Sequence, residues 1–453
     1  MITKVFKVTY LLILPALLLL AHPVKGQDKQ DGSQIRKISL EEALGITEEA
    51  SFEIRMAEAD MERVQSQYRQ TNAAFLPQLS IEETGVSTND PLNVFGFKLK
   101  QEVVTQADFN PSRLNDPDTY DNFTTKFQAQ QPLFNADAIF QRRAVKKQLE
   151  AAKEQLEGTL QHVRYQVKDT YYQLQLTDKQ LEVITKSLDT ASENERQAEN
   201  YYEQEMINKA DYLAAKVRVL ELESRQSKVR DQLQTVQDNL RYLLNIDEDI
   251  RIVATDSLQL RPGVSDGMID AENATNSRLE AMQYRMSSAR EMLRSSKFNF
   301  LPSINLFGSY EFNDEVLFGT RGDSYMIGAT LKWNLFSGFK NVGKVMESKA
   351  QLKKAELAYE STLFKNKIEI QQAQRSLDQA QEQLRFAKSS VEQAAEDFRI
   401  RKNRYEQGME KTTDLLQAET KLLQSKLQRL NALYQYNLSL ATLELLLERE
   451  MPY

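Results

Sequence analysis

The chain carries the same ordered set of sequence landmarks twice. Three pairs of segments match: AFLPQLSI at 74–81 with NFLPSINL at 299–306, QPLF at 131–134 with WNLF at 333–336, and YEQEM at 202–206 with YEQGM at 405–409. An internal repeat constrains the fold more than any local pattern, because each copy must build a similar unit. The shared order of the landmarks predicts a tandem duplication.

Long helices are the strongest local signal in both halves. Proline is absent between Pro132 and Pro262 and again between Pro302 and Pro452, which leaves room for uninterrupted helices. In the second gap, apolar residues recur at alternating steps of three and four, as in a coiled-coil seam. The residues of this seam are Ile370, Ala373, Leu377, Ala380, Leu384, Ala387, Val391, Ala394 and Phe398. The first half follows the same register through Val167, Thr170, Leu174, Thr177, Leu181, Ile184, Leu188 and Ala191.

We expect each half to fold as a helix, two strands and a long helical hairpin. The first repeat, 27–245, has a helix over 38–73, strands near 75–88 and 122–134, and a hairpin over 136–245. The second repeat, 266–450, has a helix over 266–298, strands near 300–313 and 324–336, and a hairpin over 339–448. Residues 246–265, around Pro262, form the connector.

The predicted strands alternate apolar and polar side chains. Residues 303–312 place Ile304, Leu306 and Tyr310 on one face, and 325–335 alternate in the same way. This pattern is typical of a membrane barrel wall, although a half-buried soluble sheet produces it too. Four aromatic residues near the strand ends favour the membrane interpretation: Tyr310, Phe312, Tyr325 and Trp333.

Four strands cannot close a barrel, and an open sheet edge cannot face lipid. The protein must therefore oligomerise. Three copies give a wall of about twelve strands, and the strand pattern alone leaves two or four copies open. The polar insertion at 89–121 predicts an outer loop, with 313–323 as its shorter counterpart.

The N-terminus predicts a secretory signal over residues 1–26. Lys4 and Lys7 precede an apolar run from Val8 to Ala21, and small residues follow near Gly26. Because the run is shorter than the roughly 20 residues of a spanning helix, we expect cleavage rather than an uncleaved anchor.

Composition excludes several classes of function. Removing the signal takes away three lysines and moves the formal charge from −7 to −10, which disfavours nucleic-acid binding. The chain has no cysteine, and its histidines are His22 in the signal and His162 in a long helix. We therefore expect no metal site, no cofactor and, since catalytic motifs are absent, no enzyme activity.

Together these features resemble the TolC-like outer membrane efflux protein family. The resemblance is carried by residues 39–44 (SLEEAL), by the FLP entry of each strand pair, and by the YEQEM and YEQGM turn motifs. It implies a mainly helical protomer with four β-strands that forms a homotrimer with a twelve-stranded barrel in outer membrane lipid. A helical tunnel in the periplasm would meet a periplasmic adaptor and an inner-membrane transporter.

The resemblance also implies roles for residues at the helical turns. It assigns the periplasmic aperture to Tyr202, Asp211, Tyr405, Asp414 and Gln417. It assigns adaptor contact to Glu205, Met206, Gly408 and Met409. Gln417 replaces an acid usual in the family, and Glu205 replaces a glycine, so we expect the first turn to differ in geometry. For the two aspartates, helix capping is an equal alternative to gating.

The sequence thus predicts a passive exit duct for solutes in tripartite efflux or type I secretion. Two alternatives remain: a coiled-coil scaffold of the cell envelope, and a secreted adhesin or receptor that uses the loop at 89–121. None of these residues identifies the solute that such a duct would carry.

Overall fold

The computed structural model describes residues 34–247, 249–262 and 274–450. The predicted signal and its cleavage site, connector residues 263–265 and residues 266–273 of an expected helix lie outside these ranges. The helices are α1 (Leu40–Ala50), α2 (Phe52–Gln70), α3 (Pro91–Lys100), α4 (Pro111–Asn115), α5 (Ala136–Glu203), α6 (Lys209–Leu244), α7 (Ser277–Phe298), α8 (Lys340–Glu406) and α9 (Thr412–Leu447). The strands are β1 (Gln34–Ile38), β2 (Gln78–Thr88), β3 (Tyr120–Phe134), β4 (Ile250–Ala254), β5 (Ser303–Asp314) and β6 (Gly322–Lys332), and the 3-10 turns are η1 (Thr71–Ala74) and η2 (Gln106–Phe109).

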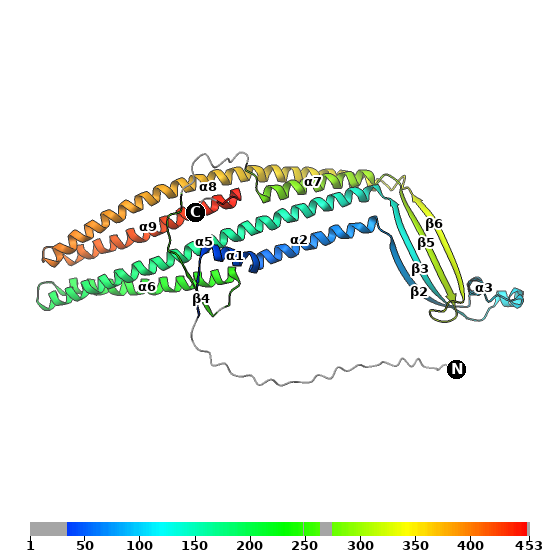
Figure 1. Ribbon diagram of the computed structural model, residues 1–453, viewed down its shortest axis with the longest axis horizontal. Helices are drawn as coiled ribbons and strands as arrows, with labels where there is room; N and C mark the ends of the chain where they lie inside the picture. The colour runs from blue at the N-terminus through cyan, green and yellow to red at the C-terminus, as the bar shows by residue number, and fades with distance from the viewer. Residues whose placement is uncertain (1–33, 248, 263–273, 451–453) are drawn as a thin grey trace, which may run out of the picture.

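Two long helices set the length of the molecule. α5 has 68 residues and α8 has 67, so each extends about 100 Å at ~1.5 Å per residue. Both run from the sheet at one end to a helical turn at the other (Figure 1). α6 and α9, each of 36 residues, return from these turns, and α2 and α7 accompany the halves nearer the sheet.

The predicted seam of α8 is buried against α9. Leu377 lies between Ala373 and Ala380, and this stretch packs in one cluster with Leu440 and Leu443 of α9. A large residue between two alanines lets the helices approach closely. Burying each leucine contributes about 1.5–3 kcal/mol relative to exposure, so this cluster holds the end of α9 against α8.

The prediction of one helix over 38–73 is wrong, because the chain breaks at Ser51. Ser39 caps α1 by accepting the N–H of Glu42 at 3.1 Å. Ser51 then leaves the helical region at φ −59°, ψ 130°, and Phe52 starts α2. α1 and α2 both contact α5, and the break lets each follow it separately.

Two short strands near the middle of the helices were missed by the sequence analysis. β1 and β4 pair in parallel, so that Arg36 lies opposite Ile252. Tyr171 of α5 is fully buried here, and its hydroxyl donates to the carbonyl of Ile38 at 3.0 Å. Burial also raises the pKa of Tyr171 above its usual value. The strands therefore tie the N-terminal segment and the connector to α5.

A buried ionic network fixes the end of the connector to both halves. The Glu444 carboxylate of α9 accepts from Lys168 of α5 at 2.7 Å and from Arg261 of the connector at 2.7 Å. Burial by itself would raise the pKa of Glu444, but the bonds from Arg261 and Lys168 outweigh it and hold the pKa below its usual value. Asn437 adds a bond to the carbonyl of Gln259 at 2.8 Å.

The four predicted strands form one antiparallel sheet in the order β2-β3-β5-β6. On one face, Lys126 of β3 lies opposite Glu311 of β5, and the two form an ion pair at 3.0 Å. The other face is apolar, and Tyr310 lies opposite Tyr325 there. Glu83, which falls on the apolar face, accepts from the hydroxyl of Thr125 on the neighbouring strand.

The apolar face of the sheet has no cover. Leu79 and Ile327 are each 79% exposed, and the sheet stands beyond the ends of the helices with none of the described helices layered on it (Figure 1). The strands β2 and β6 have only one partner each in the described chain. The protomer therefore presents two open edges and a bare apolar face.

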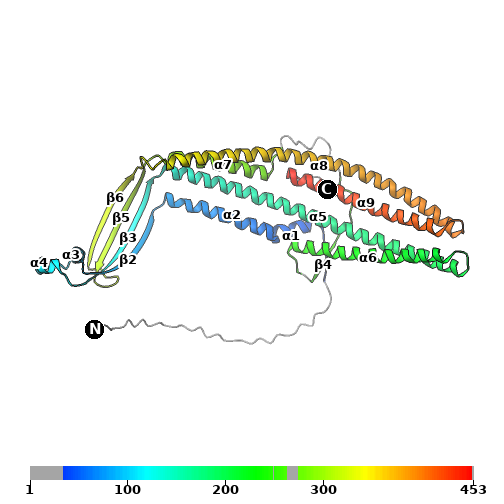
Figure 2. The same cartoon turned by 180° about the vertical axis from the view of Figure 1, so that it is seen from behind.

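The segment between β2 and β3 folds into short helices beyond the sheet (Figure 2). Gln101, directly after α3, fixes this segment to the start of β3. Its side chain is buried and donates to Asn122 at 2.8 Å. Tyr120 donates to Gln101 at 2.6 Å. Gly322 of β6 also approaches this segment closely, because an added Cβ would lie 2.0 Å from the carbonyl oxygen of Lys100.

Candidate functional site

The two helical turns lie at the end of the molecule farthest from the sheet (Figure 2). Residues 204–208 join α5 to α6, and residues 407–411 join α8 to α9. The tip residues predicted from the sequence all lie in these turns or in the helical ends beside them.

The two turns reverse the chain in the same way, so the expectation that they would differ is wrong. Glu205 has φ +59° and Gly408 has φ +71°. In the first turn, Met206 donates its N–H to the carbonyl of Tyr201 at 2.8 Å, and Met409 makes the corresponding bond at 2.9 Å. These bonds satisfy the last helical carbonyls, which offsets the roughly 1–2 kcal/mol that a side chain costs in this conformation.

An aromatic pair connects the two tips. Tyr201 of α5 meets Tyr405 of α8 edge to face, with ring centroids 5.7 Å apart. The hydroxyl of Tyr201 also lies 3.5 Å from the carbonyl oxygen of Glu406, and Gln197 donates to it at 3.0 Å. The contact was not predicted, because Tyr201 precedes the motif that the two halves share.

Tyr405 is the buried centre of this arrangement. It is 2% exposed, and Thr412 of α9 donates to its hydroxyl at 3.3 Å. Burial raises the pKa of Tyr405, and the nearby Asp211 carboxylate acts in the same direction. The fold thus joins the two hairpins at Tyr405, through Tyr201 of the first half.

Tyr202 makes a different contact from its counterpart Tyr405. It is exposed and stacks on Tyr212 of α6, with centroids 5.7 Å apart and planes at 7°. The Tyr212 hydroxyl donates to Glu199 at 3.2 Å. Tyr202 therefore braces the first hairpin, since it stacks on the return helix α6.

The predicted acids occupy equivalent positions in the first turns of α6 and α9. Asn208 caps α6, since its side chain accepts the N–H of Asp211 at 2.9 Å. Lys411 precedes α9 and offers no such side-chain bond. Both Asp211 and Asp414 are half-buried and lie where a negative charge favours the helix dipole. Gln417 is exposed one turn further along α9.

The outermost surface of the tips carries exposed methionines. Met206 is 61% exposed and Met409 is 60% exposed, at matching places in the two turns. Glu205 and Gly408 are exposed beside them. Exposed methionines suit a surface that adapts to a partner.

An ion-pair network braces the second turn. Glu410 accepts from Arg401 at 3.1 Å and pairs with Arg404 at 2.9 Å. Arg401 also pairs with Asp397 at 3.0 Å. The Asp397 and Glu410 carboxylates, with a further contribution from Asp414, raise the pKa of Arg401, which places Asp414 within the field of this cluster.

A buried polar cluster that the sequence analysis missed lies behind the tips. Glu419 of α9 accepts from Asn194 of α5 at 2.9 Å and from Arg218 of α6 at 3.4 Å. All three side chains are buried, and they join the first hairpin to the second. A signal existed for Asn194, which continues the seam three residues after Ala191.

The charges of this cluster are poorly solvated. Burial raises the pKa of Glu419, against the opposing effects of Arg218 and Asn194. Arg218 has its Nη2 buried without a hydrogen-bond partner in the described chain. An ion pair of this kind costs desolvation energy, so it favours one arrangement of the hairpins more than it adds stability.

The described residues contain no group of three or more His, Cys, Asp or Glu placed to hold a metal ion. None of the helices within those residues is both long and apolar enough to cross a membrane.

Comparison with protein families gives one match, which extends over most of the chain. The model described as "Outer membrane efflux protein" matches residues 44–245 and 268–448. The chain belongs to the outer membrane efflux protein family. Curated proteins compared with the chain gave no match.

Solved structures share the fold at low sequence identity. The outer membrane protein VceC from Vibrio cholerae has a TM-score of 0.75 at 18% identity, covering 90% of this chain and 95% of that one. The CmeC outer membrane channel from Campylobacter jejuni has a TM-score of 0.75 at 16% identity, covering 90% and 85%. A membrane protein from Pseudomonas aeruginosa has a TM-score of 0.76 at 19% identity, covering 94% and 95%.

Family and fold together support an efflux channel subunit of the outer membrane. The family is one of outer membrane efflux proteins, and CmeC is described as an outer membrane channel. The shared fold agrees with the fold expected from the sequence, which is a mainly helical chain with a small sheet at one end.

Proposed function

We propose that this chain is one of three identical protomers of a passive exit duct across the outer membrane. The four-stranded sheet is the observation that carries the proposal. Its apolar face is bare at Leu79 and Ile327, and β2 and β6 have open edges. Lipid can cover such a face, but only if another protomer pairs with each edge.

Three copies joined from β6 to β2 make a wall of about twelve strands, within the range of outer-membrane barrels. The Lys126–Glu311 face then lines the lumen, and Leu79 and Ile327 face lipid. The helices, including α5 and α8, continue the wall as a periplasmic tunnel about 100 Å long. The 89–121 insertion lies on the outer side.

We assign the periplasmic end of the tunnel to the helical tips. The aperture residues are Tyr202, Asp211, Tyr405, Asp414 and Gln417. The residues that contact a periplasmic adaptor are Glu205, Met206, Gly408 and Met409. An inner-membrane transporter supplies the energy, and the duct serves either tripartite efflux or type I secretion.

We also propose that the chain arose by tandem duplication of one repeat. The two segments matched by the family model, 44–245 and 268–448, are consistent with two tandem repeats joined by a connector. The lengths of the helices support it, because α5 and α8 have 68 and 67 residues and α6 and α9 have 36 each.

A coiled-coil scaffold of the envelope is the alternative function. It would use the same hairpins, yet it gives no role to an uncovered apolar sheet. A scaffold dissolves in buffer without detergent, whereas the duct requires detergent for extraction from membranes.

The edge pairing can be tested by disulfide cross-linking, since the chain has no cysteine of its own. Within one protomer, β2 and β6 are separated by β3 and β5, or about 14 Å at ~4.8 Å per strand spacing, which is too far for a disulfide. Ser80→Cys is combined in turn with Gly328→Cys, Thr330→Cys or Lys332→Cys.

Oxidised membranes should give dimer and trimer bands, and nothing larger, for at least one of the three pairs. The samples are boiled without reductant, so that only a disulfide can hold protomers together, and Ser80→Cys alone should run as a monomer on the same gel. If all three pairs stay monomeric under oxidation, the closed trimer is wrong.

A further inference from the structure

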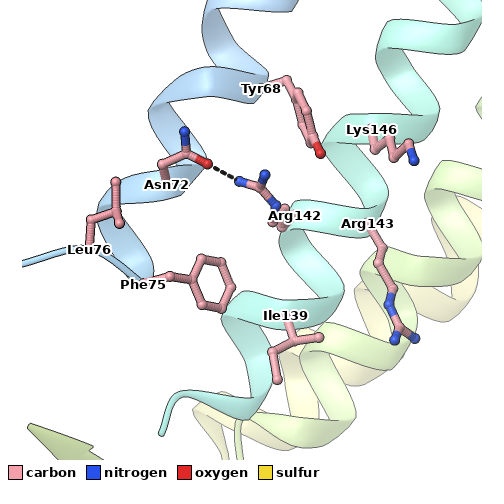
Figure 3. Close-up of a pocket in the computed structure, with 8 residues that line it drawn as sticks. All are labelled: Tyr68, Asn72, Phe75, Leu76, Ile139, Arg142, Arg143 and Lys146. Atoms are coloured by element: carbon pink, nitrogen blue, oxygen red, sulfur yellow. Dashed lines mark hydrogen bonds between the residues drawn. The ribbon is translucent and has the colours of Figure 1, made fainter. Parts of the chain in front are cut away.

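A cavity of about 570 Å³ opens at the junction of the helices and the sheet. It lies between the end of α2 and the start of α5 (Figure 3). Its walls combine two kinds of side chain: the apolar Phe75, Leu76 and Ile139, and the cationic Arg142, Arg143 and Lys146.

The apolar and cationic parts are arranged along the axis of the molecule. Phe75 and Leu76 directly precede β2, and Ile139 lies in the first turn of α5, next to β3. Arg143 and Lys146 follow Ile139 by four and seven residues, so they share its helix face about 6–10 Å further from the sheet. The cavity is thus apolar toward the sheet and cationic toward the helices.

Arg142 is held in place at one side of the cavity. Its guanidinium lies 4.5 Å from the ring centroid of Tyr68 and 5.8 Å from that of Phe75. It donates to the Thr71 hydroxyl at 2.9 Å and to the side-chain oxygen of Asn72 (Figure 3). Its orientation is therefore set before any ligand arrives.

The cations of the cavity have no acidic partners. Within the described part of the chain, none of Arg142, Arg143 and Lys146 forms an ion pair with a carboxylate. Elsewhere on the same helix, Arg196 pairs with Glu193 at 2.6 Å. Three unneutralised cations around one cavity complement an anion.

Aromatic residues mark the level of this cavity as a membrane boundary. Trp333, Phe336 and Phe339 are exposed between β6 and α8, which is the same end of the sheet. The Trp333 indole donates to the carbonyl of Phe300 at 3.0 Å. Exposed aromatics of this kind gather where hydrocarbon meets water, and this step rests on the proposed function, in which the sheet crosses the membrane.

We propose that this cavity binds an anionic glycerophospholipid of the periplasmic leaflet. Arg143 and Lys146 contact the phosphate, and Arg142 approaches it from the side with its fixed planar fork, a geometry suited to phosphate oxygens. The acyl chains follow Phe75, Leu76 and Ile139 toward the apolar face of the sheet. The site ties the junction of barrel and tunnel to the bilayer.

The test is lipid retention by the full trimer in detergent, counted by native mass spectrometry after addition of phosphatidylglycerol or phosphatidylcholine. Wild type should retain phosphatidylglycerol preferentially. The double variant R143Q/K146Q should retain about ten- to thirtyfold less, because each basic residue near a membrane surface accounts for roughly a fivefold effect on anionic lipid binding.

Two further variants make the test specific. R225Q/K228Q removes an Arg and a Lys with the same spacing from an exposed stretch of α6 and should retain lipid like wild type. The charge-keeping swap R143K/K146R should retain most of the phosphatidylglycerol. Equal losses in R143Q/K146Q and R225Q/K228Q would overturn the proposal, and so would equal retention of the two lipids.

A competition experiment separates lipid from free anion. Millimolar inorganic phosphate should not displace phosphatidylglycerol, and complete displacement would make the cavity an anion site. Trimer bands on unheated gels report on the duct independently, so loss of lipid with intact trimers in R143Q/K146Q supports the site. Absence of trimers in wild type would contradict the proposed function instead.

Discussion

Tyr201 and Tyr405 meet edge to face, with centroids 5.7 Å apart, and join the tips of two hairpins that lie about 200 residues apart in the sequence. Tyr405 is buried, Thr412 donates to its hydroxyl, and burial raises its pKa. Because both helical turns have equivalent backbone geometry, the asymmetry of the tips comes from their side chains.

Replacing the two tip acids, Asp211→Ala with Asp414→Ala, should raise ion conductance of the channel in planar bilayers. Each substitution removes a charge from the first turn of a helix, where it stabilises the helix start by about 0.5 kcal/mol. Asp231→Ala, at an exposed position of α6, is the matched control and should leave conductance unchanged. Wild-type conductance in the double variant would rule out the aperture assignment and leave the duct intact.

Removing one partner of the buried Arg218–Glu419 pair should loosen the hairpins more than removing both. Glu419→Gln leaves Arg218 with one remaining acidic partner, the exposed Glu221 at 3.5 Å, and removes its buried counter-charge, at a cost of about 3 kcal/mol. R218M/E419M replaces both charges by apolar groups and should recover most of this loss. Hydrogen exchange of peptides from α6 and α9 measures the opening, and similar exchange in the single and double variants would contradict the account.

The connector network should weaken in acid. The folded-state pKa of Glu444 lies below the usual 4.5, so the unfolded chain takes up the proton more readily. The stabilisation is therefore complete above pH 4.5 and is lost as pH falls through the folded-state pKa. At pH 7, wild type should have a higher melting temperature than Glu444→Gln. This difference in melting temperature should shrink below pH 4.5. A constant difference from pH 7 to pH 3 would argue against this role.

Gly322→Ala should displace the outer loop from the sheet. The new Cβ would lie 2.0 Å from the carbonyl oxygen of Lys100, so residues 89–119 must shift and external protease should cleave them faster. Gly343→Ala is the natural comparison, because its Cβ would meet nothing within 4 Å and alanine favours a helix by about 1 kcal/mol. Equal cleavage of both variants would mean that the close approach does not fix the loop.

The long helices could be predicted because their signal is local and repeated. Leu377 and its neighbours follow the seam without interruption, and no proline breaks it between Pro302 and Pro452. The strands of the four-stranded sheet could also be predicted, since apolar and polar side chains alternate over about ten residues in each.

The parts that sequence analysis missed depend on distant partners. β1 and β4 have five residues each and pair across more than 200 positions, so neither carries a pattern of its own. The break at Ser51 has no proline or glycine to mark it. Glu419 looked like a solvated charge, because only the packed fold reveals that Asn194 and Arg218 surround it.

The most direct test of the composite duct is gel analysis of the outer-membrane fraction, comparing unheated with boiled samples in detergent. The account predicts a trimer-sized band that requires detergent for extraction and collapses on boiling to a monomer of about 50 kDa, close to the 52.2 kDa of the full chain. A species that dissolves in buffer and runs as a monomer without heating would contradict it and favour the scaffold.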